Sequence, residues 1–474
     1  MYRKKFKILS AKKSSLFISP NALALAACGG GGASRDGTVL TTNVTLNDNN
    51  KTGLTFTGTM ATASTFPITG NNFIDATTMG SKWSPQNGIL TYAVANGFDG
   101  EEWDDIDFVN NQLETAMGQI AYYTNLKVQN LGNFADPTAA ANAGGTIVLS
   151  LDGSIISSWY GDDAWAVGFY PNATSIPYEH VAGDMFLNLN SEAANLPTEA
   201  YSPGGKGFML ILHELGHALG LKHPFDETGG RLTYEQAGYA DYQDQTYTVM
   251  AYEDEFGDVL NAPSSFMLGD VLGLMWLYGV NYTTNSGNST YIYYDATPRK
   301  TIWDASGSDT LDLTAMTDPV KVYLPYLYSD ADLGMEYGHI IQNPDTNQQK
   351  WHHLMGEFET ILCGSGDDII HGDEQKNTIS GGAGNDFIAG WEENDVLTGG
   401  GGDDFFMLAH GHGQDVIKDF EVGIDTCGFW NGSAYDASLA TLSSAANGDA
   451  MYIMTDGSSF LLEGVLQSDF SLIA

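Results

Sequence analysis

The sequence predicts an α+β region with long helices and a mixed sheet in its first half, followed by an all-β region. In the first half, apolar residues at helical spacing alternate with short apolar strands. After Asn281 no amphipathic helix stands out, and a nine-residue period runs from Cys363 to Met407. With 474 residues the chain can hold two or three domains. We expect a leader (1–28), a flexible linker or propeptide (29–70), an α+β domain (71–280) and a β domain with a C-terminal cap (281–474).

The composition is strongly acidic, with 59 Asp and Glu against 19 Lys and Arg and a formal net charge of −40. Such a surface repels phosphates and therefore excludes nucleic acid as a partner. Hydrophobic residues at 43% and aromatic residues at 12% exclude a disordered chain. An acidic chain with 56 glycines favours carboxylates gathered around calcium. Three cysteines are too few for a disulfide framework.

The N-terminus combines a basic segment, a short apolar stretch and the sequence Leu25-Ala26-Ala27-Cys28, followed by four glycines. This pattern resembles a bacterial lipoprotein signal, so membrane attachment would occur only through a lipid on Cys28. The alternative is a cytoplasmic leader whose cysteine has no role. No later stretch reaches the ~18 uninterrupted apolar residues of a membrane-spanning helix. The nearest, residues 266–280, is interrupted by Asp270 and is better explained as a buried helix.

Secondary structure in the first half follows from apolar spacing. A helix is predicted at 102–123 because its apolar side chains form one stripe, and the helix at 205–221 is almost wholly apolar. A further helix is expected at 264–278, and strands at 88–95, 145–151 and 184–189.

The most specific motif is HELGHALGLKH. On a helix His213 and His217 share a face, so both imidazoles can reach one ion with Glu214 beside them. Gly220 can adopt the left-handed conformation that ends the helix, and this turn brings His223 round as a third nitrogen ligand. Three neutral imidazoles leave a fourth position open for water, as in a catalytic zinc site. The alternative is a helix with incidental histidines, which would be costly to bury in so apolar a segment.

A methionine, Met250, follows the zinc motif in a predicted turn, and Tyr252 lies two residues further on. With the His223-Pro224 continuation and the glycine-rich nonapeptides, this arrangement resembles the serralysins, a family of metzincin peptidases. The resemblance implies a metzincin-type catalytic domain, a structural Met-turn at Met250, and Tyr252 as an additional zinc ligand that can swing away. Further matching segments are 80–83, 277–279 and 301–312, and the resemblance covers roughly residues 71 to 474.

The resemblance implies a zinc metalloendopeptidase acting on extended peptides and proteins. Zinc would lower the pKa of its water toward ~7, Glu214 would act as general base, and Tyr252 would donate to the developing oxyanion. The strand at 184–189 precedes the zinc helix, as the substrate-binding edge strand does in metzincins, and backbone pairing there implies broad specificity. The alternatives are a non-catalytic calcium-binding surface or adhesion module, and a zinc peptidase that acts on cell-wall peptides.

The nine-residue repeat consists of five rungs that start at Cys363, Gly372, Gly381, Gly390 and Gly399. In GGxGxDxUx repeats of a parallel β-roll, the first six residues form a calcium-binding turn and the eighth points into the core. Rungs of like parity stack, so the odd rungs should form one calcium edge, and the even rungs, which replace the glycines, a weak or empty one. The calcium ligands expected on the odd edge come from Asp368, Asp386, Asp404, Gly364, Gly366, Gly382, Gly384, Gly400 and Gly402.

By resemblance, further calcium ligands are Asp304, Gly307, Asp309 and Glu359, with carbonyls around Asn285, Gly287 and Ser289. Segments 415–425 and 460–474 resemble the cap and the C-terminal secretion signal of proteins exported in one step by ABC-type machinery. We therefore expect a monomer secreted from a Gram-negative cell and folded by calcium outside it, or alternatively a surface lipoprotein.

Overall fold

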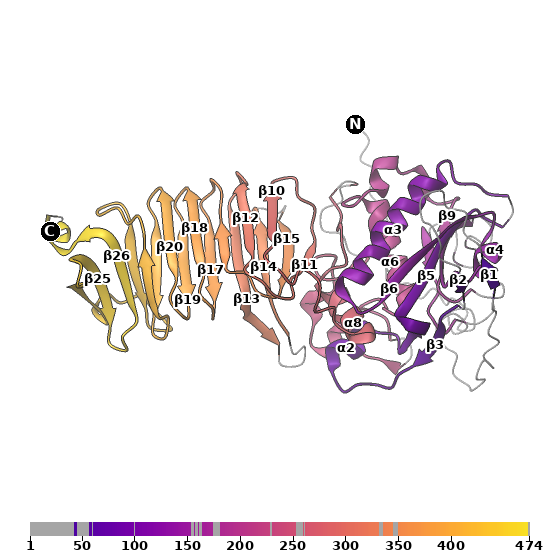
Figure 1. Cartoon of the computed structure of the whole chain (residues 1–474), viewed down its shortest axis with the longest axis horizontal. Helices are drawn as coiled ribbons and strands as arrows, with labels where there is room; N and C mark the ends of the chain where they lie inside the picture. Colours follow the sequence, from indigo (N-terminus) through magenta and orange to yellow (C-terminus); the bar gives the residue numbers. More distant parts are fainter. Residues whose placement is uncertain are drawn as a thin grey trace. The chain divides into compact units, whose positions relative to one another are not determined.

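The structure is a computed structural model, and its chain divides into two units (Figure 1). The first unit comprises residues 1–281 with 298–300, and the second comprises 282–297 with 301–474. The structure describes residues 42–44, 56–58, 60–98, 100–152, 156, 160, 164–173, 181–227, 230–252, 259, 261–330, 335–344 and 349–472. The predicted leader with Cys28, and most of the predicted linker, lie outside these residues.

The first unit is built around a five-stranded sheet in the order β6-β5-β7-β9-β8. All neighbouring pairs are parallel except β8 with β9, which is antiparallel. The strands are β5 (Ile89–Ala95), β6 (Lys127–Phe134), β7 (Ile147–Asp152), β8 (Ala166–Gly168) and β9 (Asp184–Asn188). The strand predicted at 184–189 is therefore internal, and β8 is the edge strand on that side among the described residues.

Two strand pairs lie outside this sheet, β1 (Thr42–Val44) with β2 (Phe56–Gly58) and β3 (Thr62–Thr65) with β4 (Ser81–Ser84). The guanidinium of Arg231 donates to the carbonyls of Phe66 and Pro67. The end of the predicted flexible linker is thus fixed to the first unit by strand pairing and by side-chain hydrogen bonds.

Six helices and four 3-10 turns are described in the first unit. They are α2 (Asn72–Thr77), α3 (Ile106–Tyr123), α4 (Pro137–Asn142), α6 (Lys206–Leu219), α7 (Tyr234–Ala237) and α8 (Leu268–Tyr278), with 3-10 turns η1 (Gln86–Gly88), η2 (Glu192–Asn195), η3 (Thr198–Tyr201) and η5 (Ala240–Tyr242). Two predicted helices begin later than expected. The predicted helix 102–123 begins at Ile106 because the Asp105 carboxylate caps it, and the helix predicted from 264 begins at Leu268.

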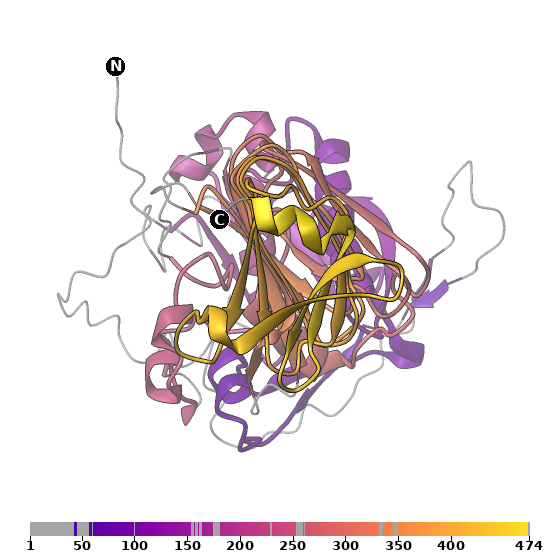
Figure 2. The ribbon, with the colours of Figure 1, turned by 90° about the vertical axis from the view of Figure 1, so that its left-hand side faces the viewer.

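The second unit consists of two sheets that enclose one apolar core. From β16 to β22 successive strands alternate between the sheets, and neighbours within a sheet run parallel, so that the chain winds as a coil (Figure 2). One sheet is β10 (Thr290–Tyr294), β12 (Thr310–Ala315), β16 (Thr360–Leu362), β18 (Thr378–Ala383), β20 (Val396–Gly401), β22 (Gln414–Ile417), β26 (Ser459–Leu466), β25 (Asp449–Met454) and β24 (Ala440–Ser444). The other is β11 (Thr301–Trp303), β15 (Lys350–Met355), β14 (Met335–Gln342), β13 (Val320–Asp330), β17 (Ile369–Asp373), β19 (Phe387–Trp391), β21 (Phe405–Ala409) and β23 (Thr426–Trp430).

The register of this coil follows the nine-residue period. The eighth residue of every predicted rung is fully buried, which confirms the inward positions Ile370, Ile379, Ile388, Leu397 and Phe406. Short 3-10 turns, η6 (Ala437–Leu439) and η7 (Gln467–Leu472), are the helical elements among the described residues of this unit. In neither unit does a described helix have the length and hydropathy needed to cross a bilayer.

The predicted cap begins too early. Residues 410–415 form a further turn, and β22 continues the coil by pairing in parallel with β20. Two residues, Leu408 and Ala409, separate this turn from the fifth rung and interrupt the nine-residue period. The coil therefore has a sixth rung, HGHGQDVIK, in which Ile417 is the fully buried eighth residue.

Candidate metal centres

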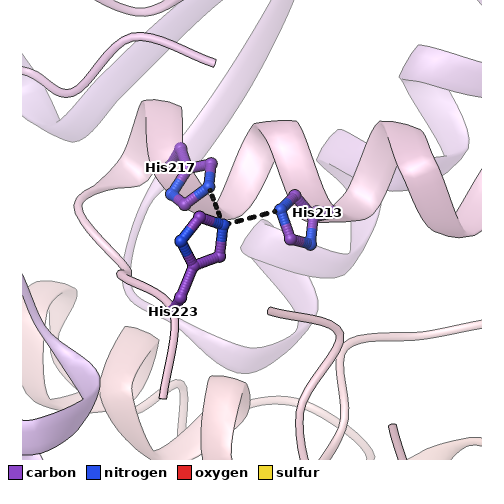
Figure 3. Close-up of side chains that lie close together, drawn as sticks. All are labelled: His213, His217 and His223. Carbon is purple, nitrogen blue, oxygen red and sulfur yellow. Dashed lines mark hydrogen bonds between the residues drawn. The ribbon is translucent and has the colours of Figure 1, made fainter. Parts of the chain in front are cut away.

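Three histidines meet in the first unit, and they are the metal-ligand cluster found among the described residues (Figure 3). The Nε2 atom of His223 lies 3.2 Å from Nε2 of His213 and 3.0 Å from Nε2 of His217. His213 and His217 share one face of α6, which ends at Gly220 with a left-handed φ of 103°. This backbone turn, in which the Leu221 N–H donates to the Gly216 carbonyl, returns the chain toward His223.

The second nitrogen of each ring is held by the protein. Nδ1 of His213 lies 2.7 Å from the Val249 carbonyl, and Nδ1 of His217 lies 3.1 Å from the Leu221 carbonyl. Nδ1 of His223 lies 3.1 Å from the carboxylate of Asp226. Because these partners are acceptors, each Nδ1 carries the proton and each Nε2 presents a lone pair to the other two. Three lone pairs at this separation repel one another unless a cation lies between them, so the donor set fits zinc.

The surroundings keep two of these rings uncharged. Burial, with the neighbouring His223 as a smaller cause, lowers the pKa of His213 to about 3. The pKa of His217 is lowered well below its ordinary value for the same reason. Neutral imidazole is the form that binds metal, so both ligands are ready at neutral pH.

Glu214 lies beside the cluster and is 5% exposed. Burial raises the pKa of its carboxyl to about 8, and a hydrogen bond with the Gly168 backbone opposes that rise. Gly168 ends the edge strand β8, and a β-carbon there would collide with the backbone of Glu214. The edge strand nearest the candidate base is therefore β8, which corrects the expectation that strand 184–189 has this role, because strand order in the sheet does not follow sequence order.

The turn that contains Met250 contacts the zinc-motif helix α6 and the ring of His213. The carboxylate of Asp270 accepts hydrogen bonds from the Thr248 hydroxyl at 2.6 Å and the Val249 N–H at 2.8 Å. Met250 is buried, and its sulfur packs against Gly216 of α6. Asp270 thus fixes the segment whose Val249 carbonyl orients His213.

Two aromatic rings flank the third histidine. The Tyr252 ring lies 4.7 Å from that of His223 and 5.8 Å from that of His213, and it is 36% exposed. Phe225 stacks parallel on His223 at 5.0 Å and is 44% exposed. Burial, followed by the charges of Glu214 and Asp226, raises the pKa of the Tyr252 phenol. Tyr252 therefore keeps its proton and can act as a donor.

Asp226 and Asp270 were missed by the sequence reasoning. Asp226 lies three residues after a metal-ligating histidine, which is a spacing that could have suggested a carboxylate partner for that ring. Asp270 was interpreted only as an interruption of an apolar stretch. A lone carboxylate in the first turn of an apolar helix indicates capping or anchoring, and that signal could have found it.

In the second unit, the sixth-position carboxylates of the odd rungs form a ladder. The N–H of Asp368 donates to Oδ1 of Asp386 at 2.9 Å, and the N–H of Asp386 donates to Oδ1 of Asp404 at 2.9 Å. The Oδ2 atoms of Asp368 and Asp386 are buried and have no hydrogen-bond partner. The turns of the later odd rungs contain glycines with positive φ, namely Gly382, Gly384, Gly400 and Gly402. Neighbouring backbone atoms leave no room for a β-carbon at these four glycines or at Gly364 and Gly366.

A second group of predicted calcium ligands also lies together. The N–H of Ser289 donates to Oδ1 of Asp309 at 2.6 Å, and the N–H of Asp309 donates to Glu359 at 2.6 Å. A β-carbon at Gly307 would meet both Asp309 and the Gly287 carbonyl. Asp304 accepts from the Tyr291 hydroxyl at 2.5 Å, and burial raises the pKa of its carboxyl to about 6. Asn285 donates its amide to Tyr291 and to the Trp303 carbonyl.

Comparison with known proteins finds a repeat family in the second unit and several peptidase relatives. Residues 364–397 and 392–409 match the RTX calcium-binding nonapeptide repeat (4 copies). The chain is 31% identical over 264 residues to a serralysin of Proteus mirabilis, with 49% of this chain and 50% of the relative covered. It is 29% identical over 280 residues to the metallopeptidase AprA of Pseudomonas marginalis, covering 54% of each, and 33% identical over 209 residues to serralysin C of Dickeya chrysanthemi, covering 40% of each.

The chain spans about half the length of the curated relatives that it matches. These comparisons give no support to the lipoprotein interpretation of Cys28. The histidine cluster is compatible with the zinc of a metalloprotease, and the repeats carry the calcium-binding pattern. The chain is therefore serralysin-like, and its second unit carries RTX calcium-binding repeats.

Proposed function

We propose that the chain is a calcium-stabilised zinc endopeptidase that hydrolyses peptide bonds of extracellular proteins. The observation that carries this proposal is the convergence of three histidine Nε2 atoms beside a buried carboxyl, Glu214. The metalloprotease names of the relatives support it. The zinc ligands would be His213, His217 and His223, joined by Tyr252 in the resting site.

When bound, zinc would polarise the scissile carbonyl and acidify a water molecule. Glu214 would accept the proton of the attacking water and later deliver it to the leaving amine. The Gly168 N–H would hold the Glu214 carboxylate in place during this exchange. Tyr252, whose ring lies beside His223, would donate its hydroxyl hydrogen to the developing oxyanion.

The substrate would bind as an extended strand along β8 (Ala166–Gly168), the edge strand that contacts α6. Backbone pairing reads main chain rather than side chains, which favours broad specificity. Because the Gly168 backbone forms a hydrogen bond with the Glu214 carboxyl, a peptide paired with β8 would pass next to the general base. This placement replaces the earlier expectation for residues 184–189.

The deciding experiment is casein hydrolysis by the full chain with saturating calcium. Glu214→Gln should lower kcat/KM by ~10²–10⁴-fold while the zinc content stays unchanged, because the variant loses proton transfer but no ligand. Glu235→Gln, which alters an exposed carboxylate in α7 of the same unit, is the matched control and should keep full activity. Hydrolysis that survives Glu214→Gln would contradict the assignment. A wild-type chain that binds zinc and calcium but cleaves nothing would favour a non-catalytic calcium-binding surface module.

We also propose that the protein acts outside a Gram-negative cell, because millimolar calcium would then be available to the repeats. Lipid attachment at Cys28 and export by ABC-type machinery remain predictions. The mass of the mature N-terminus would separate an acylated Cys28 from a retained leader and from cleavage near residues 66–75.

A further inference from the structure

A lysine side chain is buried next to the third histidine of the zinc motif. Lys222 directly precedes His223 and is 1% exposed. Its Nζ atom donates to the carbonyl of Asp226 at 2.6 Å, to that of Leu232 at 2.9 Å and to that of His223 at 3.4 Å. The three hydrogens of one ammonium group therefore meet three backbone carbonyls. Lysine is rarely buried to this extent, and the carbonyls offset the cost of removing its charge from water.

All three acceptors lie in one segment of the chain, residues 223–232, which the structure describes except for residues 228 and 229. We call this segment the ligand loop. It follows the left-handed turn at Gly220 that ends α6. Lys222 bonds to both ends of the ligand loop, since His223 is its first residue and Leu232 its last. The ammonium group thus holds the two ends together.

Three side chains of the candidate zinc site belong to the ligand loop, namely His223, Phe225 and Asp226. Nδ1 of His223 lies 3.1 Å from the Asp226 carboxylate, and the Phe225 ring stacks on that of His223 at 5.0 Å. His213 and His217 are held by α6 itself, whereas His223 lies on the chain that follows this helix (Figure 3). A shift of the ligand loop would therefore move the third ligand away from two ligands that stay in place.

The backbone of Lys222 is fixed to another part of the first unit. Its N–H donates to the carbonyl of Thr77, the last residue of α2, at 3.0 Å. The preceding residue, Leu221, forms an isolated antiparallel bridge with Thr78. The lysine side chain therefore extends from a fixed point, and its hydrogen bonds connect the ligand loop to the segment around α2.

The charge of Lys222 has the opposite effect on a zinc ion from that of its hydrogen bonds. Burial lowers the pKa of its ammonium to about 8, and the charge of Asp226 opposes this change. A positive charge next to the site repels a divalent cation, so the charge alone would weaken zinc binding. The hydrogen bonds would strengthen it, because they keep the ligand loop in place. The sign of the change in zinc affinity when Lys222 is replaced therefore shows which effect is larger.

We propose that Lys222 is a positioning residue for the third zinc ligand. Its ammonium group fixes the ligand loop, and the loop keeps His223 directed at the other two imidazoles before the ion binds. Lys222 is not a catalytic residue, since it acts through the backbone carbonyls of the loop. The inference rests on the proposed function, because it requires that the three histidines bind zinc.

The first measurement is the zinc affinity of the full chain, from competition with a chromophoric chelator. Lys222→Met keeps an unbranched apolar stem but leaves the three carbonyls without their donor. We expect zinc binding to weaken by about 10–100-fold, the usual effect of losing a group that orients a metal ligand. Lys222→Gln removes the same charge but keeps an amide donor, so its zinc affinity should lie between those of Lys222→Met and the wild type.

Lys222→Gln also covers the case in which Lys222→Met does not fold. Both variants lack the charge, so the difference between them reports the hydrogen bonds. A zinc affinity equal to or higher than that of the wild type, in either variant, would overturn the proposal, because removal of the charge alone strengthens zinc binding.

Lys82→Met is the matched control. Lys82 is a partly buried lysine of β4 whose Nζ donates to the Leu277 carbonyl of α8 at 2.8 Å. Its loss should lower the Tm of the first unit and leave zinc affinity unchanged. Cobalt(II), bound in place of zinc, reports the geometry of its ligands through visible absorption bands, which should change in Lys222→Met but not in Lys82→Met. Equal loss of zinc affinity in both variants, with unchanged cobalt spectra, would show a general loss of stability and would overturn the proposal.

The same measurements separate this inference from the proposed function. If the wild type binds zinc but does not hydrolyse casein, the peptidase assignment fails, and weaker zinc binding by Lys222→Met still supports the role of Lys222. If the wild type hydrolyses casein and Lys222→Met binds zinc as tightly as the wild type, the role of Lys222 alone is overturned.

Discussion

The two candidate metal centres of this chain differ in the charge of their proposed ligands and in how the protein holds those ligands without metal. In the first unit the proposed ligands are imidazoles, and each ring is fixed through its Nδ1 by Val249, Leu221 or Asp226. In the second unit the proposed ligands are buried carboxylates, several with an oxygen that has no hydrogen-bond partner, and other carboxylates lie close to them. The zinc site should therefore keep its geometry without metal, whereas the coil depends on its ions for stability.

The largest expected effect is the loss of the coil when calcium is removed at neutral pH. Without calcium, burial raises the pKa of the Asp368, Asp386 and Asp395 carboxyls to about 7 and that of Asp415 to about 8. A folded-state pKa above the unfolded value of ~3.9 stabilises the fold at low pH, and this stabilisation is lost as pH rises through the folded pKa. The free energy of unfolding of the calcium-free second unit should therefore fall steadily between about pH 4 and 8.

With saturating calcium the sign reverses, because protons compete with the ion for the same oxygens. The Tm of the second unit, followed by calorimetry with and without a calcium-selective chelator, should rise with pH in calcium and fall with pH in chelator. The pH dependence of the first-unit transition should be the same in calcium and in chelator. A reversal of sign in both transitions would contradict the contrast between the two centres.

The turn after α6 offers the next largest effect. Gly220 is left-handed, and a β-carbon there would collide with the Ser81 carbonyl, so Gly220→Ala should displace the segment that carries His223. Gly238, which ends α7 with a φ of 92° and has open space around it, is the matched control. Gly238→Ala should cost ~1–2 kcal/mol in unfolding free energy from conformation alone. Gly220→Ala should cost clearly more and should also weaken zinc binding, and equal costs with unchanged zinc affinity would refute the steric explanation.

A smaller effect is expected at the carboxylate behind His223. Asp226→Asn removes the charge that holds the Nδ1 proton and should weaken zinc binding by ~10–100-fold, as loss of such partners usually does. Zinc affinity can be measured by competition with a chromophoric chelator. Asp241→Asn, on an exposed residue of η5, is the control and should have no effect. The calcium-dependent Tm of the second unit should be the same in both variants, and a zinc affinity unchanged in Asp226→Asn would show that His223 is oriented by other contacts.

The parts of these centres that the sequence could predict are those encoded by local spacing. Helical periodicity placed His213 and His217 on one face, and the nine-residue period placed Ile370 and Ile388 in the core. The sixth rung was missed because two extra residues break that period before His410. A search for a fixed nine-residue spacing does not find a rung that follows an insertion. In the structure β22 still pairs in parallel with β20 after the two extra residues.

The remaining features depend on contacts between distant segments. Asp270 anchors Val249 across the loop between the Met250 turn and α8, and Gly168 approaches Glu214 from another strand. The order of the strands in the sheet also depends on contacts between distant segments. The chain reaches β9 after β8, yet β9 pairs with β7 and leaves β8 at the edge. Periodicity reports which face of a strand is apolar but not which neighbour it will have, so the substrate edge was assigned to the wrong strand.

The smallest expected effect concerns Phe225, whose exposed ring stacks on His223 and lies 4.9 Å from the ring of Tyr252. An exposed aromatic face beside the metal centre should contact the substrate side chain nearest the cleaved bond. Phe225→Ala should lower kcat/KM by about 2–10-fold for peptides with an aromatic residue next to the cleaved bond, because the interaction energy of a typical aromatic pair corresponds to a rate change of this size. For peptides with a small residue at that position, kcat/KM should not change.

The control for this prediction is Trp276→Ala, which removes a 52% exposed ring from α8 of the same unit. Trp276→Ala should not change kcat/KM for either set of peptides. If Phe225→Ala lowers cleavage of both series equally, the ring supports His223 rather than the substrate, because a displaced metal ligand slows every reaction alike. Zinc affinity measured on the same variant separates these cases: a substrate-contacting ring leaves it unchanged, whereas a ring that supports His223 does not. If zinc affinity is unchanged in Phe225→Ala, the substrate-contacting ring of Phe225 is not needed for metal binding. The preformed part of the zinc site would then consist of the three histidines and their Nδ1 partners, in contrast to the coil, which depends on its ions.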